Sequence, residues 1–281
     1  MTVKSQVGTG SPSRRNASPR VRGRGTLATP GSANLFRLDP AALQPRLLKT
    51  YEELLGVHGP QGWWPGRHSF EVCAGAILVQ NTAWTNARKA LDNLQRGGAD
   101  SVLGVLTLSE AKLADLIRPS GYYNQKAAKL AGFCDYVADN YGADLERFLS
   151  LPRDRLRAEL LSLWGIGAET ADSIILYAAR QPSFVIDTYT VRFLARLGIV
   201  PRDVKRDELR TSVMDALPED VELYAEMHAL IVQHGKRFCG TSPRCGDCPL
   251  IGSCDFGQST GVVGARPASR NDFDVDQWTG T

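Results

Sequence analysis

The sequence predicts an all-α fold. Nine segments carry apolar residues at three- and four-residue intervals, the spacing that lines one face of an α-helix. Glycine or proline interrupts most of the junctions between these segments, as is typical of helix ends. No segment alternates apolar and polar residues as a half-buried β-strand does, and the apolar run at residues 184–186 is too short to build a sheet.

The nine predicted helices follow one another along the chain. In the first half they are residues 47–55, 70–78, 85–94, 109–117 and 124–140. In the second half they are residues 155–163, 168–179, 188–197 and 222–238. No internal repeat relates them. We therefore expect a single helical body whose two ends pack together.

The bulk composition allows a real core and argues against a membrane protein. The chain has 281 residues, of which 43% are hydrophobic, and this fits one or two domains. No run approaches the length of a membrane span, and we see no N-terminal segment of secretory type.

Both ends of the chain have the composition of disordered tails. Residues 1–36 are rich in Ser, Gly, Pro and Arg and hold six basic residues but no acidic one. We interpret them as a solvated basic tail, with a nucleic-acid-binding arm and a transit peptide as alternatives. Residues 258–281 are expected to be disordered as well. Because the whole chain carries only +3, the rest is net acidic, and it must bind any polyanion through a local patch and backbone amides.

Four cysteines lie within sixteen residues and indicate a metal site. The spacing C-x5-C-x2-C-x5-C is interrupted by Gly and Pro turns, and disulfides are not expected in a chain without a secretory signal. Zinc and a [4Fe–4S] cluster are both compatible with this spacing. Cys73 and Cys134 lie instead on apolar helical faces and are expected to be inert core residues. The four candidate ligands are Cys239, Cys245, Cys248 and Cys254.

A glycine-rich turn and a carboxylate follow in the second half. Gly165, Ile166 and Gly167 join two predicted helices, and the glycines permit a tight turn whose amides can bind a phosphate. An ordinary helix–helix turn is the alternative. Asp187 follows three apolar residues and precedes a helix, so it is either an N-cap or a pocket carboxylate that stabilises positive charge or activates water.

Taken in order, these motifs resemble the helix-hairpin-helix DNA glycosylases of the endonuclease III superfamily. LWGIG followed by TA is similar to the hairpin, VIDT to the catalytic-aspartate segment, and HGKRFC with the cysteines to the cluster loop. The resemblance implies a [4Fe–4S] cluster, a six-helix domain at residues 62–180 and a cluster domain formed by residues 37–61 and 181–257. It also implies that DNA binds in the cleft between these domains. The first cysteine gap is five residues, where endonuclease III itself typically has six.

A second departure concerns catalysis. Glu169 stands where bifunctional members of the family have the lysine that forms a Schiff base with the sugar. A carboxylate cannot form an imine, so the lysine-dependent AP lyase reaction is expected to be absent and water to be the nucleophile.

The adjacent Trp63 and Trp64 restrict the resemblance to one branch of this superfamily. GWWPG and AILVQNTAWTNARKAL are similar to the endonuclease III-like 3-methyladenine DNA glycosylases, a branch that also has a glutamate at the position of Glu169. The resemblance implies that Gln80 fills the gap left by a flipped base, and that a lysine near the C-terminus lines the pocket, although no motif locates this lysine. The base pocket would then be formed by Trp63, Trp64, Pro65, Trp84 and Glu169, with Tyr189 and Trp164 as weaker candidates.

These residues suit an alkylated purine. Such a base is cationic, is attracted by the faces of indole rings, and leaves the sugar readily once flipped out of the duplex. The sequence thus predicts a monofunctional DNA glycosylase for alkylated purines that acts as a monomer in the bacterial cytoplasm. Two alternatives stay open: a glycosylase for oxidised pyrimidines or mismatched bases, and a non-catalytic iron–sulfur DNA-binding protein.

Overall fold

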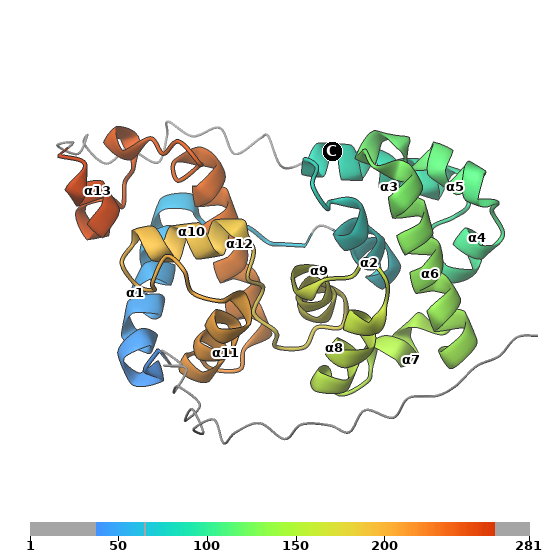
Figure 1. The fold of residues 1–281 in the computed structure, drawn as a ribbon, viewed down its shortest axis with the longest axis horizontal. Helices are drawn as coiled ribbons and strands as arrows, with labels where there is room; N and C mark the ends of the chain where they lie inside the picture. Colours follow the sequence, from blue (N-terminus) through green and yellow to red (C-terminus); the bar gives the residue numbers. More distant parts are fainter. Residues whose placement is uncertain (1–37, 65, 262–281) are drawn as a thin grey trace, which may run out of the picture. The chain divides into compact units, whose positions relative to one another are not determined.

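The computed structural model of the protein describes residues 38–64 and 66–261, and in these ranges every regular element is a helix (Figure 1). The predicted all-α class is therefore confirmed. The expected tail at residues 1–36 and most of the one at residues 258–281 lie outside the described residues, as does Pro65. Gln258 and Ser259 still belong to helix α13, so the helical part extends slightly beyond the predicted boundary. No helix in the described ranges is long and apolar enough to cross a membrane.

One group of helices is built from residues 69–178. Helix α6 packs against α4 and α5, while α2 contacts α3, α6 and the π-helix η2 (Figure 1). The elements are α2 (Ser69–Leu78), α3 (Trp84–Arg96), α4 (Val102–Leu106), α5 (Glu110–Leu116), η1 (Arg118–Ser120), α6 (Tyr123–Tyr141), α7 (Leu145–Leu149), α8 (Arg153–Ser162), α9 (Ala168–Ser173) and η2 (Ile174–Ala178).

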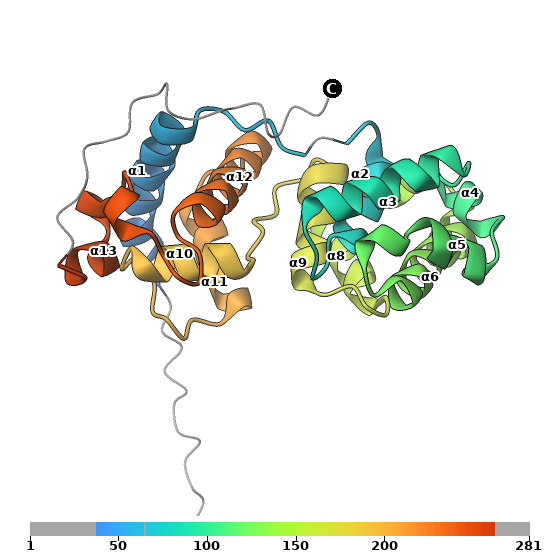
Figure 2. The same ribbon diagram turned by 90° about the horizontal axis from the view of Figure 1, so that it is seen from above.

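A second group joins the first described helix to the last ones. Helix α1 packs against α11 and α12, and α10 packs against α12 and α13 (Figure 2). Ser253 donates a hydrogen bond to Glu53 over 2.9 Å, so the two ends of the described chain pack together as predicted. The elements are α1 (Pro40–His58), α10 (Thr188–Arg196), α11 (Arg206–Ala216), α12 (Val221–Arg237), η3 (Cys245–Asp247), η4 (Ile251–Ser253) and α13 (Asp255–Ser259).

The structure differs from the predicted helices in three respects. Helices α4, α7 and α13 have five residues each, too few to show a helical period. Helix α11 was missed because its buried face includes Ser212 beside Leu209 and Val213. The segment 168–179 is not one α-helix: it changes at Ile174 into a π-helix, where the Ala179 amide bonds to the Ile174 carbonyl.

Candidate active site

A cavity of about 460 Å³ opens beside Asp187. Its lining comes from four parts of the chain: residues 63–64, the turn at residues 79–85, the segment that runs from α9 to α10, and one face of α12. Most of the lining surface is apolar, and the acidic or basic side chains in it are Glu169, Asp187, His228 and Lys236. Such a concave, largely apolar site with a few polar groups is the usual form of a small-ligand pocket.

Three indole rings line this cavity. The ring of Trp64 lies 5.2 Å from that of Trp84 at 87° and 6.1 Å from that of Trp63 at 68°, measured between ring centroids. Trp63 and Trp64 are joined by a cis peptide bond. The structure thus brings together the three described tryptophans that the sequence assigns to a pocket.

Asp187 is both the N-cap of α10 and part of the cavity wall. Its Oδ1 accepts hydrogen bonds from the amide and the hydroxyl of Thr190, at 2.7 and 2.9 Å. Burial acts to raise the pKa of Asp187, but the nearby ring of His228 and the hydrogen bonds from Thr190 bring it below the usual value. The carboxylate is therefore ionised although only 7% of the residue is exposed, so the two interpretations of Asp187 from the sequence are compatible.

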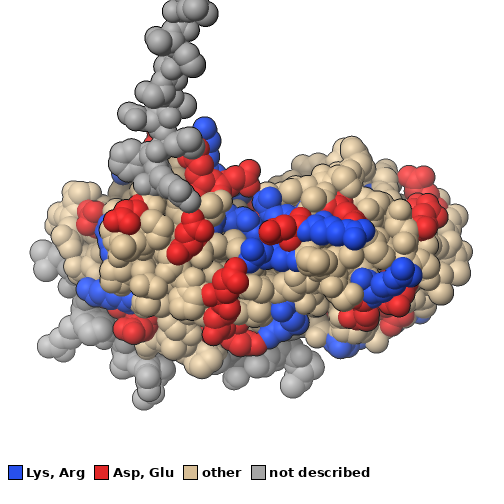
Figure 3. All heavy atoms as spheres, turned by 90° about the horizontal axis from the view of Figure 1, so that it is seen from below, with Lys and Arg blue, Asp and Glu red and all other residues tan. Residues whose placement is uncertain are grey.

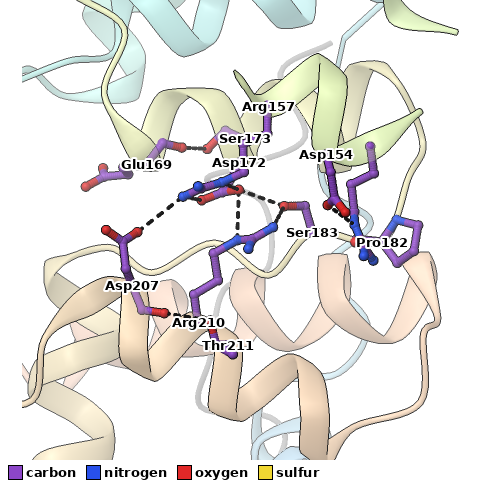
Figure 4. Close-up of polar contacts among 11 residues, drawn as sticks. Asp154, Arg157, Glu169, Asp172, Ser173, Pro182, Ser183, Asp207, Arg210 and Thr211 are labelled. Carbon is purple, nitrogen blue, oxygen red and sulfur yellow. Dashed lines mark hydrogen bonds and ion pairs between the residues drawn. The ribbon is translucent and has the colours of Figure 1, made fainter. Parts of the chain in front are cut away.

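The segment that leads to Asp187 is anchored by a buried ion-pair network (Figure 4). Oδ1 of Asp172 accepts from Arg157 and Arg210, each at 2.9 Å, and from the Ser183 hydroxyl at 2.7 Å. Arg210 also donates to Ser183 over 2.7 Å. Helices α8, α9 and α11 thereby hold the chain four residues before Asp187. The sequence analysis missed this network, although an aspartate on the buried face of α9 was a visible signal.

Glu169 lines the cavity and is bonded to Arg206. Its Oε2 lies 3.1 Å from Nη1 of Arg206, which also donates to the carbonyl of Ile186 over 3.3 Å. Burial and the negative charge of Asp187 raise the pKa of Glu169, while Arg206 opposes this shift. Glu169 thus lines the cavity while its carboxylate accepts a hydrogen bond from Arg206 of helix α11.

The glycine turn between α8 and α9 has the hairpin geometry expected from the sequence. Gly165 has a φ of 81°, and a Cβ there would lie 2.4 Å from Lys129, so a side chain is excluded. Gly167 is the N-cap of α9, whose first intrahelical bond runs from the Ala171 amide to the Gly167 carbonyl. The preceding amides therefore have no partner within the helix.

The side chain of Gln80 packs on this hairpin. Its amide donates to the Gly165 carbonyl over 3.1 Å and to Thr170 over 3.0 Å, and its oxygen accepts from Lys129 at 2.6 Å. Trp164 lies outside the cavity wall and is 67% exposed, with Nζ of Lys129 6.0 Å from its ring centroid. Tyr189, the other weak candidate, does line the cavity.

Helix α12 supplies pocket residues that sequence reasoning did not place. His228, Val232 and Lys236 recur every four residues and all line the cavity, so helical spacing was the available signal. Nζ of Lys236 lies 5.7 Å from the centroid of the Trp63 ring. Burial lowers the pKa of Lys236, and the negative charge of Asp187 opposes this. Lys236 is thus a lysine near the C-terminus that lines the cavity.

A second, basic cavity of about 390 Å³ borders helix α10. Its lining contains four arginines and no acidic residue. Arg192 and Arg196 are held in place by the backbone carbonyls of residues 239–241. Elsewhere charge is mixed: on the face drawn in Figure 3, basic side chains gather near the middle with acidic ones around them. The lining is Thr188, Val191, Arg192, Ala195, Arg196, Arg202, Arg206 and Phe256.

The four clustered cysteines share one neighbourhood next to α10 and α12. Nη1 of Arg196 donates to the sulfur of Cys239 over 3.3 Å, and the Gly257 amide donates to that of Cys254 over 3.4 Å. Nε2 of His234 lies 3.4 Å from the sulfur of Cys248, and its tautomer decides which of the two donates. Burial, together with the other three cysteines, raises the pKa of Cys248 to about 11. Such donors favour thiolates, so the sulfur-only donor set fits an iron–sulfur cluster or zinc. Within residues 38–64 and 66–261, no three His, Cys, Asp or Glu side chains are already arranged around a metal-ion position.

The other two cysteines lie in the core. Cys73 and Cys134 have no exposed surface, and burial raises the pKa of each, that of Cys134 to about 12. Thiols in this state are not reactive, as the sequence predicts.

The hairpin, the buried aspartate and the all-helical fold define a helix-hairpin-helix DNA glycosylase. Residues 74–219 match the HhH-GPD superfamily of base excision DNA repair proteins, and this match spans more than half of the chain, which belongs to that superfamily. A Methanocaldococcus jannaschii protein with the provisional name of DNA repair glycosylase is 44% identical over 74% of this chain and 95% of its own length.

Two solved structures extend the comparison. An endonuclease III–DNA complex superposes with a TM-score of 0.67 at 24% identity, over 78% of this chain and 98% of that chain. The Helicobacter pylori 3-methyladenine DNA glycosylase bound to 1,N6-ethenoadenine gives a TM-score of 0.57 at 31% identity, over 71% and 98%. The first likeness concerns the fold, and the second also extends to the sequence.

Proposed function

We propose that this protein is a monofunctional DNA glycosylase that hydrolyses the N-glycosidic bond of alkylated purines of the 3-methyladenine or 7-methylguanine type. The observation that carries the proposal is a single cavity in which three indole rings face an ionised, buried aspartate. The 31% identity to a glycosylase named for 3-methyladenine supports the same substrate class.

The aromatic wall accounts for the choice of base. A purine rotated out of the duplex needs flat apolar surfaces to replace its lost stacking. An N-alkylated purine carries positive charge, and each indole face attracts it by about 0.5–2 kcal/mol, with the larger values in desolvated sites. Glu169 at the cavity wall adds negative charge, although Arg206 neutralises part of it.

Asp187 performs the hydrolytic step. When the C1′–N bond breaks, its electron pair passes to the purine and neutralises the cationic ring, while positive charge develops on the sugar. The Asp187 carboxylate stabilises that charge and accepts a proton from the water whose oxygen bonds to C1′. Because Glu169 cannot form an imine, the reaction ends at an abasic site.

The DNA backbone has two docking points in this proposal. The hairpin of Gly165, Ile166 and Gly167 binds one phosphate through the amides of its two glycines, since the Ile166 amide donates to the Leu163 carbonyl, and the arginine-lined cavity beside Thr188 attracts another phosphate. Gln80 sits on the hairpin and fills the space left by the flipped base. Residues 62–180 form one domain, whose described part holds the eight helices α2 to α9 and not the six expected, and residues 37–61 with 181–257 form the cluster domain, with DNA in the cleft between them.

Cys239, Cys245, Cys248 and Cys254 hold the [4Fe–4S] cluster in this proposal. When bound, the cluster contributes binding free energy that fixes the loop of residues 239–254. That loop supplies the carbonyls that orient Arg192 and Arg196. The four cysteines thus affect DNA binding indirectly, because they fix the loop that orients Arg192 and Arg196.

The proposal is tested by chromatography of bases released from methylated duplex DNA, comparing wild type with Asp187→Asn. Release of 3-methyladenine or 7-methylguanine by wild type alone, with DNA binding kept in the variant, is the expected result. No release by wild type would refute the alkylpurine assignment. Duplexes with oxidised pyrimidines or mismatches then test the alternative substrates, and binding without release of any base would indicate a non-catalytic DNA-binding protein.

A further inference from the structure

A tyrosine–histidine pair lies directly behind the catalytic carboxylate. Oη of Tyr177 is 2.7 Å from Nδ1 of His228, and Nε2 of His228 is 3.7 Å from Oδ2 of Asp187. At most 7% of each of these three residues is exposed. They come from η2, α12 and the cap of α10, so Tyr177 lies within the π-helical turn. π-Helical turns are often found at functional sites.

The contacts of His228 decide which ring nitrogen carries a proton. The Tyr177 hydroxyl has two acceptors in reach, Nδ1 of His228 at 2.7 Å and the Ala225 carbonyl at 3.3 Å. If the hydroxyl bonded to the carbonyl, the proton of a neutral ring would sit on Nδ1, and the Nε2 lone pair would face a carboxylate. Donation to Nδ1 instead places an N–H opposite Asp187. An imidazolium also has that N–H, so Nε2 is a donor in either state.

This N–H has no hydrogen-bond partner in the described structure. A separation of 3.7 Å is longer than a hydrogen bond, and a buried donor without a partner destabilises the structure. The facing oxygen is the one that Thr190 leaves unused, since both Thr190 donors bond to Oδ1. Trp63 packs edge-on against the His228 ring at 5.9 Å, so the pair borders the wall of the base pocket.

We infer that His228, oriented by Tyr177, is a positioning residue for Asp187. Its N–H holds Oδ2 toward the cavity, and the contact shortens to a hydrogen bond when a flipped nucleotide excludes water. The inference rests on the proposed function, because it assigns His228 to the base-release step. It requires His228 to act on the rate of that step and not on DNA binding.

Two substitutions separate this role from a structural one. His228→Gln is expected to slow single-turnover release of 3-methyladenine from methylated duplex about 100-fold, as misplacement of a catalytic group does. Affinity for a duplex with a tetrahydrofuran abasic-site analogue should stay within about threefold of wild type. Tyr177→Phe should slow release about 10-fold, because it frees the ring tautomer. Tyr224→Phe is the matched control: it removes a buried hydroxyl that also lacks a partner in the described residues but lies outside the cavity lining.

A measurement that needs no substrate completes the test. The chain has four histidines, so ¹⁵N-histidine spectra can be assigned by substitution. His228 should show a protonated Nε2 in wild type and in Tyr224→Phe, and a mixture of tautomers in Tyr177→Phe. The inference would be overturned if His228→Gln released 3-methyladenine at the wild-type rate, or if it lost release and abasic-site binding in parallel. Spectra of the wild type that show His228 with an unprotonated Nε2 would also overturn it. If wild type releases no methylated base, the substrate assignment fails, and the spectra still decide the orientation of His228.

Discussion

Nη1 of Arg206 lies 3.1 Å from Oε2 of Glu169 and 3.3 Å from the carbonyl oxygen of Ile186. Helix α11 therefore connects Glu169 to the residue that precedes Asp187. The side chain of Glu169 is half-exposed and lines the cavity. A group at this position can thus reach a nucleotide bound beside Asp187.

Glu169→Lys is expected to gain a reaction that the wild type lacks. A lysine at the cavity wall can attack C1′ of an abasic site, and borohydride reduces the resulting imine to a stable adduct. Wild type and the control Glu169→Gln should give no adduct on abasic duplex in a denaturing gel, whereas Glu169→Lys should. A strong adduct with wild type would show that another lysine, Lys236 first, performs lyase chemistry.

Trp84→Ala should weaken turnover of methylated bases at least 10-fold, since tenfold corresponds to about 1.4 kcal/mol and the indole contributes both area and cation–π attraction. The change also removes the ring that packs edge-on against Trp64 at 5.2 Å. Single-turnover release of 7-methylguanine measures the effect. The control is Trp164→Ala, which deletes an equally large ring from the exposed hairpin. Equal losses in the two variants would contradict a pocket role for Trp84.

Asp187→Asn should reveal the carboxylate's contribution to stability through its pH dependence. The pKa of Asp187 is lowered in the folded protein from its usual 3.8, so the ionised form stabilises the fold. That contribution is fully present above pH 3.8 and is lost as the pH falls through the lower folded value. Asparagine keeps an N-cap acceptor but no charge. The difference in unfolding free energy between wild type and Asp187→Asn, from urea titrations at several pH values, should therefore be largest near neutrality and shrink in acid. A difference that grows in acid would contradict this assignment.

How much the sequence could predict depends on the sequence separation of the interacting groups. Helical period and glycine punctuation indicate most helices, the hairpin and the cap at Asp187, because these features are local. The contact of Tyr177 with His228 spans 51 residues, and the bond from Gln80 to Gly165 spans 85. The helical period of the sequence could not predict the contact of Tyr177 with His228, because the π-helix shifts Tyr177 out of the register of α9. Helical spacing puts Lys236 on one face of α12 with His228 and Val232, but the sequence does not say that this face meets the cavity.

The buried network at Asp172 should be a main source of stability for the segment that carries Asp187. Asp172→Ala leaves Arg157 and Arg210 facing each other without their carboxylate, and breaking such a buried pair costs about 3–5 kcal/mol. Asp207→Ala is the control, since it removes a partner of the same Arg157 whose side chain is 81% exposed, and should cost less than about 1 kcal/mol. Urea unfolding with unchanged m-values measures both. Similar losses in the two variants would mean that Asp172 does not anchor the segment.

The purified protein should be brown, with an absorbance band at about 400 nm, if the four cysteines hold an iron–sulfur cluster. Cys248→Ser removes one ligand and should abolish most of this absorbance, together with part of the affinity for duplex DNA, because the loop that orients Arg192 and Arg196 loses its anchor. Cys134→Ala is the matched control: it deletes a buried thiol in the core and should leave the iron content unchanged. Iron and sulfide analysis beside the spectra separates the metals. A colourless protein with one zinc per chain would refute the cluster and leave the cysteine site intact, since zinc accepts the same four sulfurs.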